Sequence, residues 1–271
     1  STDLMLFLVF LMFIQLKGLV NNQICIKNRK SCMSLLNKIR KKFWKININV
    51  ERFSSLKNYL SRRIQLLNYY NIDIVLDIGA NIGQYGSELR DLGYKNEIIS
   101  FEPLESAYKD LEKKSHLDSK WNAFNYGLGS KEGSMQINIA ENSYSSSILE
   151  ILPKHTDISP TSNYVSRESI KIKTLDSVFN NFCDSSSNIY MKIDTQGFEK
   201  EVLSGAKASL KKINLLQIEM SLVPLYKNEA SFNEMLEFLT KNHYQLIGFE
   251  SGFVDHTSGE LLQVDGLFKR I

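Results

Sequence analysis

Apolar and polar positions alternate along the chain with two periods, which together predict a regular series of strands and helices. Short apolar runs predict buried strands at 74–78, 97–101, 123–126, 189–193 and 215–220. Apolar residues spaced three and four apart predict helices within 52–71 and over 83–92, 104–114 and 199–210. This alternation of strand and helix predicts a parallel, doubly wound sheet with right-handed crossovers.

Residues 231–271 predict a different ending for the sheet. An amphipathic helix over 231–242 begins at Ser231, and Glu234 completes a capping box. Two apolar segments, 244–249 and 261–268, then predict an antiparallel terminal hairpin.

A long segment without clear periodicity interrupts the middle of the chain. Residues 134–140 and 169–173 alternate as strands do, whereas 141–168 is rich in Ser, Asn and Pro. A loop of this length inside a compact domain is usually functional or mobile. His155 lies within it and is either a mobile base or an ordinary surface residue.

The N-terminal part of the chain predicts an apolar segment, 1–32, and a basic helical arm, 33–71, before a domain over 72–271. The apolar run 4–14 is eleven residues long, whereas a helix that spans a membrane needs about 20. Asp3 precedes the run and no A-x-A site follows it, so it does not resemble a signal peptide. Met33 opens a plausible reading frame, which leaves three interpretations of 1–32: translated upstream sequence, a short membrane anchor or a docked helix.

Charge separates the arm from the domain. Residues 1–63 have a net charge of +11, and the remaining 208 residues have a net charge of −8. An acidic body is poorly suited to nucleic acid, whose binding depends on neutralising phosphates, and we expect no nucleic-acid partner. The basic stretch 34–45 either packs its apolar stripe on the body or lies on an anionic membrane as a peripheral contact.

Composition excludes several other classes of protein. With 43% hydrophobic and 23% charged residues, the 271-residue chain can form a packed core. Its three cysteines form no C-x-x-C pair, and its four histidines form no H-E-x-x-H motif. The default expectation is a protein of a reducing, cytoplasmic compartment.

The strongest chemical signal is the turn D-I-G-A-N-I-G at 77–83, between the first strand and its helix. Gly79 permits a tight turn, and Gly83 permits close approach of the helix and a ligand. Asp77 would repel a pyrophosphate but suits an ammonium or sulfonium group, and Glu102 can accept hydrogen bonds from both hydroxyls of a ribose. A nicotinamide site prefers G-x-G-x-x-G, but position 81 is Asn, and the G-K-[ST] of a nucleotide-triphosphate loop is absent. These residues favour S-adenosylmethionine (SAM) over NAD.

Six ordered blocks over roughly 72–271 resemble one family. The blocks LDIGANIGQYGSELR, SFEP, YGLGS, MKIDTQGFEKEVLSGA, LLQIEMSLVPLY and LLQVDGLFKR are similar to those of the FkbM family of SAM-dependent methyltransferases. The resemblance implies a Rossmann-like class I SAM-methyltransferase fold: α/β, with a mostly parallel, doubly wound, seven-stranded sheet and an antiparallel C-terminal hairpin. It also implies O-methylation of a saccharide or a glycosylated small molecule, as in polysaccharide or glycan modification.

The resemblance further implies a set of residues around the cofactor. These are Asp77, Gly79, Asn81, Gly83, Gln84, Tyr85, Phe101, Glu102, Pro103, Gly127 and Leu128. The run 144–147 resembles the family's serine-rich substrate loop, and its alternative interpretation is a plain mobile linker.

Methyl transfer to a sugar hydroxyl requires a base or a cation, because the hydroxyl proton is weakly acidic. Asp194, after the fourth strand, is the first candidate for the base, and its alternative is the N-cap of the helix that follows. Lys192 either orients Asp194 or is an edge charge, and Glu219 ends the fifth strand near the same cleft. Glu199 has a simpler interpretation as a charge at a helix N-terminus.

Metal dependence and two other functions stay open at this stage. Asp194, Glu219 and a third acid could hold Mg²⁺, but no spacing demands it, and we assign no metal ligand. The other functions are methylation of another small molecule or a protein, and a non-catalytic glycan-binding module that keeps the fold. The intact Asp77, glycines and Glu102 favour an enzyme.

Overall fold

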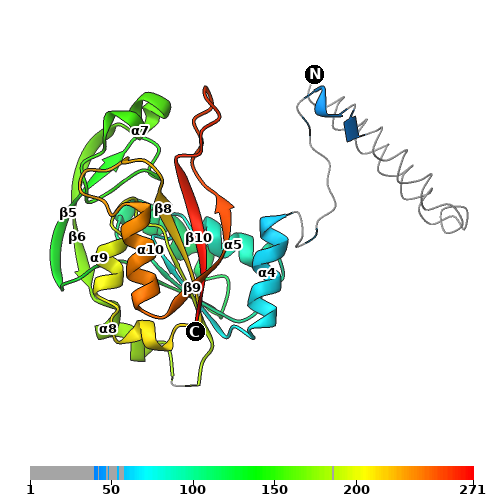
Figure 1. Cartoon of the computed structure of the whole chain (residues 1–271). Coiled ribbons are helices and arrows are strands. Elements are labelled where there is room, and N and C mark those ends of the chain that lie inside the picture. Colours follow the sequence, from blue (N-terminus) through cyan, green and yellow to red (C-terminus); the bar gives the residue numbers. More distant parts are fainter. Residues whose placement is uncertain (1–39, 42, 47, 49–53, 55–57, 185) are drawn as a thin grey trace, which may run out of the picture. The chain divides into compact units, whose positions relative to one another are not determined.

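The computed structural model describes residues 40–41, 43–46, 48, 54, 58–184 and 186–271 (Figure 1). The chain divides into two units, 1–57 and 58–271, and the second contains the fold. The predicted segment 1–32 and most of the basic stretch 34–45 lie outside the described residues. No helix in the described part of the chain is long and apolar enough to cross a membrane.

A seven-stranded sheet forms the centre of the second unit (Figure 1). Its strands are β1 (Ile74–Ile78), β2 (Glu97–Phe101), β3 (Trp121–Phe124), β7 (Ile189–Ile193), β8 (Leu215–Ser221), β9 (Tyr244–Ser251) and β10 (Gln263–Arg270). They lie in the order β3-β2-β1-β7-β8-β10-β9, and β10 runs antiparallel to both β8 and β9. The predicted parallel, doubly wound sheet with its antiparallel terminal hairpin is therefore confirmed.

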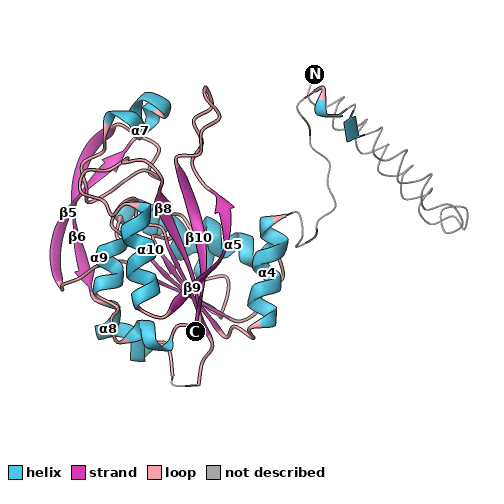
Figure 2. Ribbon diagram, viewed as in Figure 1, coloured by secondary structure: helices cyan, strands magenta, loops and turns pink. Residues whose placement is uncertain are grey.

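Alternating side chains on the strands build two apolar cores, one on each face of the sheet. Val75 and Tyr190 pack with residues of α4 (Tyr59–Tyr69), α5 (Gln84–Asp91) and α6 (Glu105–Ser115). Leu76 and Met191 face the other way and pack with residues of α8 (Leu175–Val178), α9 (Glu199–Ser204) and α10 (Phe232–Lys241). Figure 2 shows these three helices on the same side of the central sheet. The predicted capping box of α10, between Ser231 and Glu234, is present.

Helix α4 belongs to the same unit as the sheet, so the expected boundary of the arm at residue 71 falls inside this unit. The reason is packing: Leu67 on α4 is 1% exposed and lies in the core with Val75. The helix begins where the Asn58 side chain accepts a hydrogen bond from the Ser61 backbone N–H at 3.0 Å.

A second, three-stranded sheet flanks the predicted long loop of 141–168 and includes only its last five residues, 164–168. It contains β4 (Gly127–Leu128), β5 (Gly133–Ala140) and β6 (Tyr164–Lys173), in the order β4-β6-β5. The predicted strand at 169–173 in fact begins at Tyr164, and the connection before it contains helix α7 (Pro153–Ile158) and a 3₁₀ turn. The first residues of β6 are mostly polar and exposed, so apolar alternation does not predict where this strand begins.

The serine run 144–147 is ordered by hydrogen bonds, so the mobile-linker interpretation is wrong. Ser147 is 1% exposed and donates its hydroxyl to the carbonyl oxygen of Gln196 at 2.6 Å. Ser145 and Ser162 share a hydrogen bond of 2.9 Å between their hydroxyls. These hydroxyl contacts join residues 49 and 17 positions apart, so they give no periodic signal in the sequence.

Strand β3 begins two residues before the predicted start because Trp121 fills the core beside α5. Its indole N–H donates to the Ser100 hydroxyl at 3.0 Å, and a Cβ added at Gly86 would lie only 2.3 Å from its ring. Gly86 therefore lets α5 lie directly against the indole.

We expect Gly86→Ala to destabilise the protein by about 1–3 kcal/mol, because the added methyl group would overpack this contact. The helical preference of Ala opposes this by only about 0.5–1 kcal/mol. Urea unfolding measures the difference, and Ser106→Ala on the exposed side of α6 is the control. A Gly86→Ala variant as stable as the parent would show that the indole can move aside.

Candidate active site

A cavity of about 440 Å³ lies at the carboxyl ends of the central strands. In open α/β sheets this edge is where ligands bind. The predicted residues that line it are Gly79, Asn81, Gln84, Tyr85, Phe101, Glu102, Pro103, Gly127, Leu128, Lys192 and Asp194. The structure thus brings eleven of the fourteen predicted site residues together at one cavity.

The glycine turn after β1 depends on backbone conformations that other residues rarely adopt. Gly79 has φ of +81°, and a Cβ there would lie 1.8 Å from the carbonyl oxygen of Asp194. Asn81 also has positive φ, at 47°. Gly79 therefore lets the ends of β1 and β7 touch, which puts the turn and Asp194 in one wall of the cavity.

Gly83 serves the packing of α5 and is absent from the described cavity lining. It is the N-cap of α5, with φ of +79°, and a Cβ there would lie 2.9 Å from Leu111 and 3.1 Å from Trp121. Gly83 therefore sets where α5 begins.

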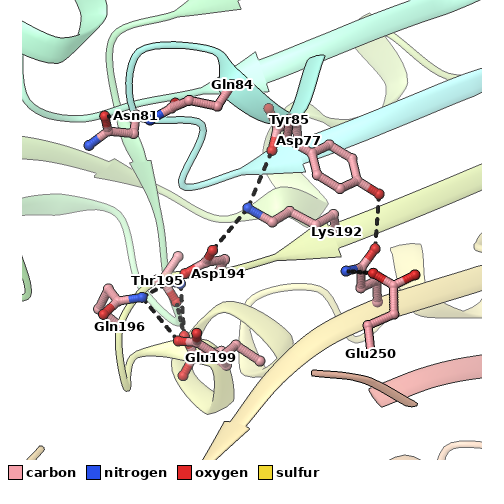
Figure 3. Close-up of polar contacts among 12 residues, drawn as sticks. Asp77, Asn81, Gln84, Tyr85, Lys192, Asp194, Thr195, Gln196, Glu199 and Glu250 are labelled. Carbon is pink, nitrogen blue, oxygen red and sulfur yellow. Dashed lines mark hydrogen bonds and ion pairs between the residues drawn. The ribbon is translucent and has the colours of Figure 1, made fainter. Parts of the chain in front are cut away.

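Asp77 lies beneath the turn rather than in the wall of the cavity. Its side chain is fully buried; one oxygen accepts a hydrogen bond from the Ser100 hydroxyl at 3.2 Å, and the other lies 3.8 Å from the Lys192 ammonium (Figure 3). Burial raises the pKa of Asp77, and Lys192 acts against that rise. The carboxylate thus supplies a negative potential below the turn.

Glu102, at the end of β2, is held by two backbone amides. The Asn81 N–H donates to its Oε2 at 2.7 Å, and the Leu104 N–H donates to its Oε1 at 2.8 Å. Burial raises the pKa of Glu102 to about 7, although both amides lower it. Each carboxylate oxygen keeps a further lone pair for a hydroxyl donor.

The cavity is apolar beside Glu102. Buried Leu104, Ile137, Ile170 and Ile172 form one cluster, and all four line the cavity together with Leu128. This part of the wall can take a flat, apolar ring system next to a carboxylate that accepts hydroxyl donors.

Asp194 follows β7 and receives two side-chain hydrogen bonds. The Lys192 ammonium donates to its Oδ2 at 3.1 Å, and the Gln196 amide donates to its Oδ1 at 2.8 Å (Figure 3). The helix-cap interpretation of Asp194 is wrong, because α9 begins at Glu199 with Phe198 as its N-cap.

Lys192 is not an edge charge, because β7 lies in the middle of the sheet and Lys192 is in register with Asp77 on one side and Gln217 on the other. Burial acts to lower the pKa of Lys192, but Asp194 and Asp77 together raise it above its usual value. The ammonium therefore stays charged between two carboxylates.

Glu219 and Glu199 lie behind Asp194, and among the described residues neither lines the cavity. Glu219 accepts a hydrogen bond from the Gln196 amide at 3.0 Å; burial, followed by the nearby Asp194 and Glu199, raises its pKa well above the usual value. Glu199 accepts the backbone N–H groups of Thr195 at 2.7 Å and of Gly197 at 3.2 Å. It therefore holds the turn after Asp194 in place.

In the part of the chain that the structure describes, no group of three His, Cys, Asp or Glu side chains is arranged to hold a metal ion. His155 is not a surface residue: it is 4% exposed, its ring centre lies 5.3 Å from that of Tyr226, and burial lowers its pKa to about 4. Its apolar neighbours come from distant segments, which the sequence did not reveal.

The structure adds a polar network to the other end of the cavity. The Arg63 guanidinium pairs with Glu88 and with Glu250, and Gln217 accepts the hydroxyl of Tyr85 at 2.9 Å. Arg63, Glu250 and Gln217 all line the cavity. The one signal in the sequence was Gln217, a polar residue within an otherwise apolar strand.

The strand order, the antiparallel β10 and the glycine turn define a class I methyltransferase fold. A family model described as the methyltransferase FkbM domain matches residues 77–246. The chain therefore belongs to the FkbM family of SAM-dependent methyltransferases.

Solved structures with similar folds share little sequence with this chain. The methyltransferase FkbM from Methylobacillus flagellatus KT is 15% identical, with a TM-score of 0.43, over 72% of this chain and 44% of that one. TehB from Haemophilus influenzae is 12% identical, with a TM-score of 0.43, over 78% and 62%. Magnesium protoporphyrin IX methyltransferase from Synechocystis PCC 6803, solved with bound SAM, is 8% identical, with a TM-score of 0.43, over 87% and 96%. The chain thus spans less than half the length of the first of these, and a search of curated proteins found no match.

The buried Glu199 predicts a specific pH dependence of stability. Burial raises its pKa from 4.5 to about 7, so folding takes up a proton between these values and stability falls as pH rises through this window. Glu199→Gln removes this dependence and can still accept the backbone N–H groups. We expect the variant to gain stability relative to the parent between pH 5 and pH 8, by up to about 3 kcal/mol.

Chemical unfolding of parent and variant at both pH values measures this difference, and the comparison at pH 5 serves as the control. A stability difference that stays constant with pH would contradict the assignment.

Proposed function

We propose that this enzyme transfers the methyl group of SAM to a hydroxyl of a saccharide or glycosylated small molecule. The observation that carries the proposal is the position of Asp194. Its carboxylate is held by Lys192 and Gln196 in the cavity wall, and its backbone touches the glycine turn at Gly79.

The residues present fit SAM in charge and shape. Glu102 offers carboxylate lone pairs to the two ribose hydroxyls, and Leu128 and the isoleucines beside it offer an apolar wall to the adenine. Gly79 places no side chain on the turn, and Asp77 beneath the turn favours a positively charged group. Bound SAM supplies a methyl group on a sulfonium, which is already a good electrophile.

In this mechanism Asp194 is the general base. Its carboxylate would accept the proton of the acceptor hydroxyl as the oxygen displaces the thioether sulfur from the methyl carbon. The Lys192 ammonium, 3.1 Å from Oδ2, donates a hydrogen bond to the Asp194 carboxylate and fixes its direction. Burial, followed by the nearby Asp194 and Glu199, raises the pKa of Glu219 well above its usual value, which disfavours a second negative charge next to the base.

The wall around the turn suits an uncharged polyol acceptor. It includes the amides of Asn81 and Gln84 and the hydroxyl of Ser143, which lies 3.5 Å from the Asn81 amide nitrogen. Next to Ser143, the side chain of Tyr144 is 58% exposed and offers an aromatic face to a sugar ring. Amides, hydroxyls and an aromatic ring together match the hydroxyls and C–H faces of a saccharide.

The direct test incubates the protein with methyl-labelled SAM and a panel of nucleotide sugars and oligosaccharides. We expect label in a product whose methyl group is an alkali-stable ether. Label found only on amines or on protein would contradict O-methylation of a saccharide.

Glu102→Ala tests the cofactor site. The variant removes the acceptor of the ribose hydroxyls, and we expect SAM affinity to fall about tenfold to a hundredfold. Isothermal titration calorimetry measures the dissociation constant, and Glu105→Ala on the exposed first turn of α6 is the matched control. An unchanged dissociation constant in a folded Glu102→Ala protein would show that the ribose lies elsewhere.

Asp194→Asn tests the base. The amide keeps the shape but cannot take the proton, so we expect kcat to fall about 10²–10⁴-fold while SAM affinity changes little. Asp110→Asn on the exposed side of α6 should retain full activity. Near-normal turnover of Asp194→Asn would end the catalytic assignment.

A further inference from the structure

Gln196 lies between two carboxylates that come from different strands. Its Nε2 donates to Asp194 Oδ1 at 2.8 Å (Figure 3). It also donates to Glu219 Oε2 at 3.0 Å, which uses both N–H groups of the amide. Its Oε1 accepts the Tyr226 hydroxyl at 2.7 Å. With donors and acceptor engaged in three directions, the amide has one orientation.

The backbone at Gln196 is held in a conformation that few non-glycine residues adopt. Its φ is +55°, in the left-handed region. Its carbonyl oxygen accepts the Ser147 hydroxyl at 2.6 Å, and Gly197 follows with φ of +93°. Glycine at 196 would relieve the backbone cost but would lose the amide, so the strain points to a function of the side chain.

Tyr226 is itself anchored to the segment 143–152, which contributes Ser143, Tyr144, Ser146 and Ile148 to the cavity wall. Its side chain is 1% exposed, and its hydroxyl lies 3.4 Å from the Ser145 carbonyl oxygen as well as near Gln196. The segment around it pairs with the loop before α7: the Leu152 N–H donates to the Leu225 carbonyl at 2.8 Å, and the Lys227 N–H donates to the Glu150 carbonyl at 2.8 Å. The hydroxyl that orients Gln196 therefore has a fixed position.

We propose that Gln196, oriented by Tyr226, is a positioning residue for methyl transfer, which fixes the Asp194 carboxylate and keeps Glu219 from approaching it. This inference rests on the proposed role of Asp194 as the base. Gln196 acts through Asp194 rather than on the cofactor, since its amide nitrogen is occupied by the two carboxylates.

The charges around Asp194 explain why a neutral donor is needed at this position. The ionisable groups that face it are Lys192 on β7, Asp77 on β1, Glu199 on α9, Glu219 on β8, Asp265 on β10 and the Tyr226 phenol. Four of these are carboxyl groups, and Lys192 is their one ammonium neighbour in this set. A carboxylate in place of the Gln196 amide would add like charge against both Asp194 and Glu219.

The test compares Gln196→Glu, Gln196→Ala and Tyr226→Phe with the parent. We expect kcat to fall about a hundredfold in both Gln196 variants and about tenfold in Tyr226→Phe, which removes one hydroxyl and keeps the ring. The acid limb of the kcat profile should move to higher pH by about one unit in Gln196→Ala, as expected for one lost charge-assisted hydrogen bond. KM for the acceptor and the dissociation constant for SAM should stay within about threefold of the parent, because the residue acts through the base.

Tyr164→Phe is the matched control. Its hydroxyl donates to the Leu149 carbonyl at 2.8 Å in the same segment, 143–152, and not to Gln196. A parent-like kcat and acid limb in Tyr226→Phe and Gln196→Ala would overturn the inference, as would an equal loss in Tyr164→Phe.

A second readout needs no acceptor. In protein labelled with ¹³C at the aspartate carboxyl carbon, with the Asp194 signal assigned from Asp194→Asn, the titration midpoint of that signal should rise in Gln196→Ala and Tyr226→Phe and stay unchanged in Tyr164→Phe. An unmoved midpoint overturns the positioning role, whereas a moved midpoint in a protein that methylates no hydroxyl places the failure in the proposed function.

Discussion

The site depends on the contact between the ends of β1 and β7. At Gly79 the two chains approach so closely that a single Cβ would lie 1.8 Å from the Asp194 carbonyl oxygen, and the Asp194 N–H donates to Ile78 at 3.0 Å. Below this contact the Lys192 ammonium lies between the carboxylates of Asp77 and Asp194. The glycine turn and the candidate base are therefore joined directly in one wall of the cavity.

Buried charge is the second feature of the site, and its balance sets which groups can react. Burial raises the pKa values of Asp77, Glu102, Glu199 and Glu219, whereas Lys192 stays charged because carboxylates surround it. A buried acid with a raised pKa costs stability when it ionises. The chain retains several of them at one edge of the sheet, which is typical of a functional site rather than of a core built for stability.

The position of Asp194 could be predicted from the sequence, but its contacts could not. Strand patterning placed it correctly at the carboxyl end of a buried strand, but base, helix cap and metal ligand were all consistent with that position. The cap interpretation failed because the chain makes a turn through Gln196 and Gly197 before α9 begins, and Glu199 ties that turn together. Lys192 is likewise central because the strand order places β7 between β1 and β8.

The sequence by itself determined the parallel sheet, its antiparallel ending, the glycine turn and the acidic residues that follow the strands. These features are local: apolar period, turn chemistry and capping residues act between near neighbours in the chain. Tertiary structure alone decided that Arg63 and Glu250 meet at the cavity, that the serine run is ordered, and that Tyr226 orients Gln196. Each of these contacts joins residues 30 or more positions apart in the chain. Local sequence patterns cannot predict such contacts, because the strand order and the packing of the loops over the sheet decide which distant residues meet.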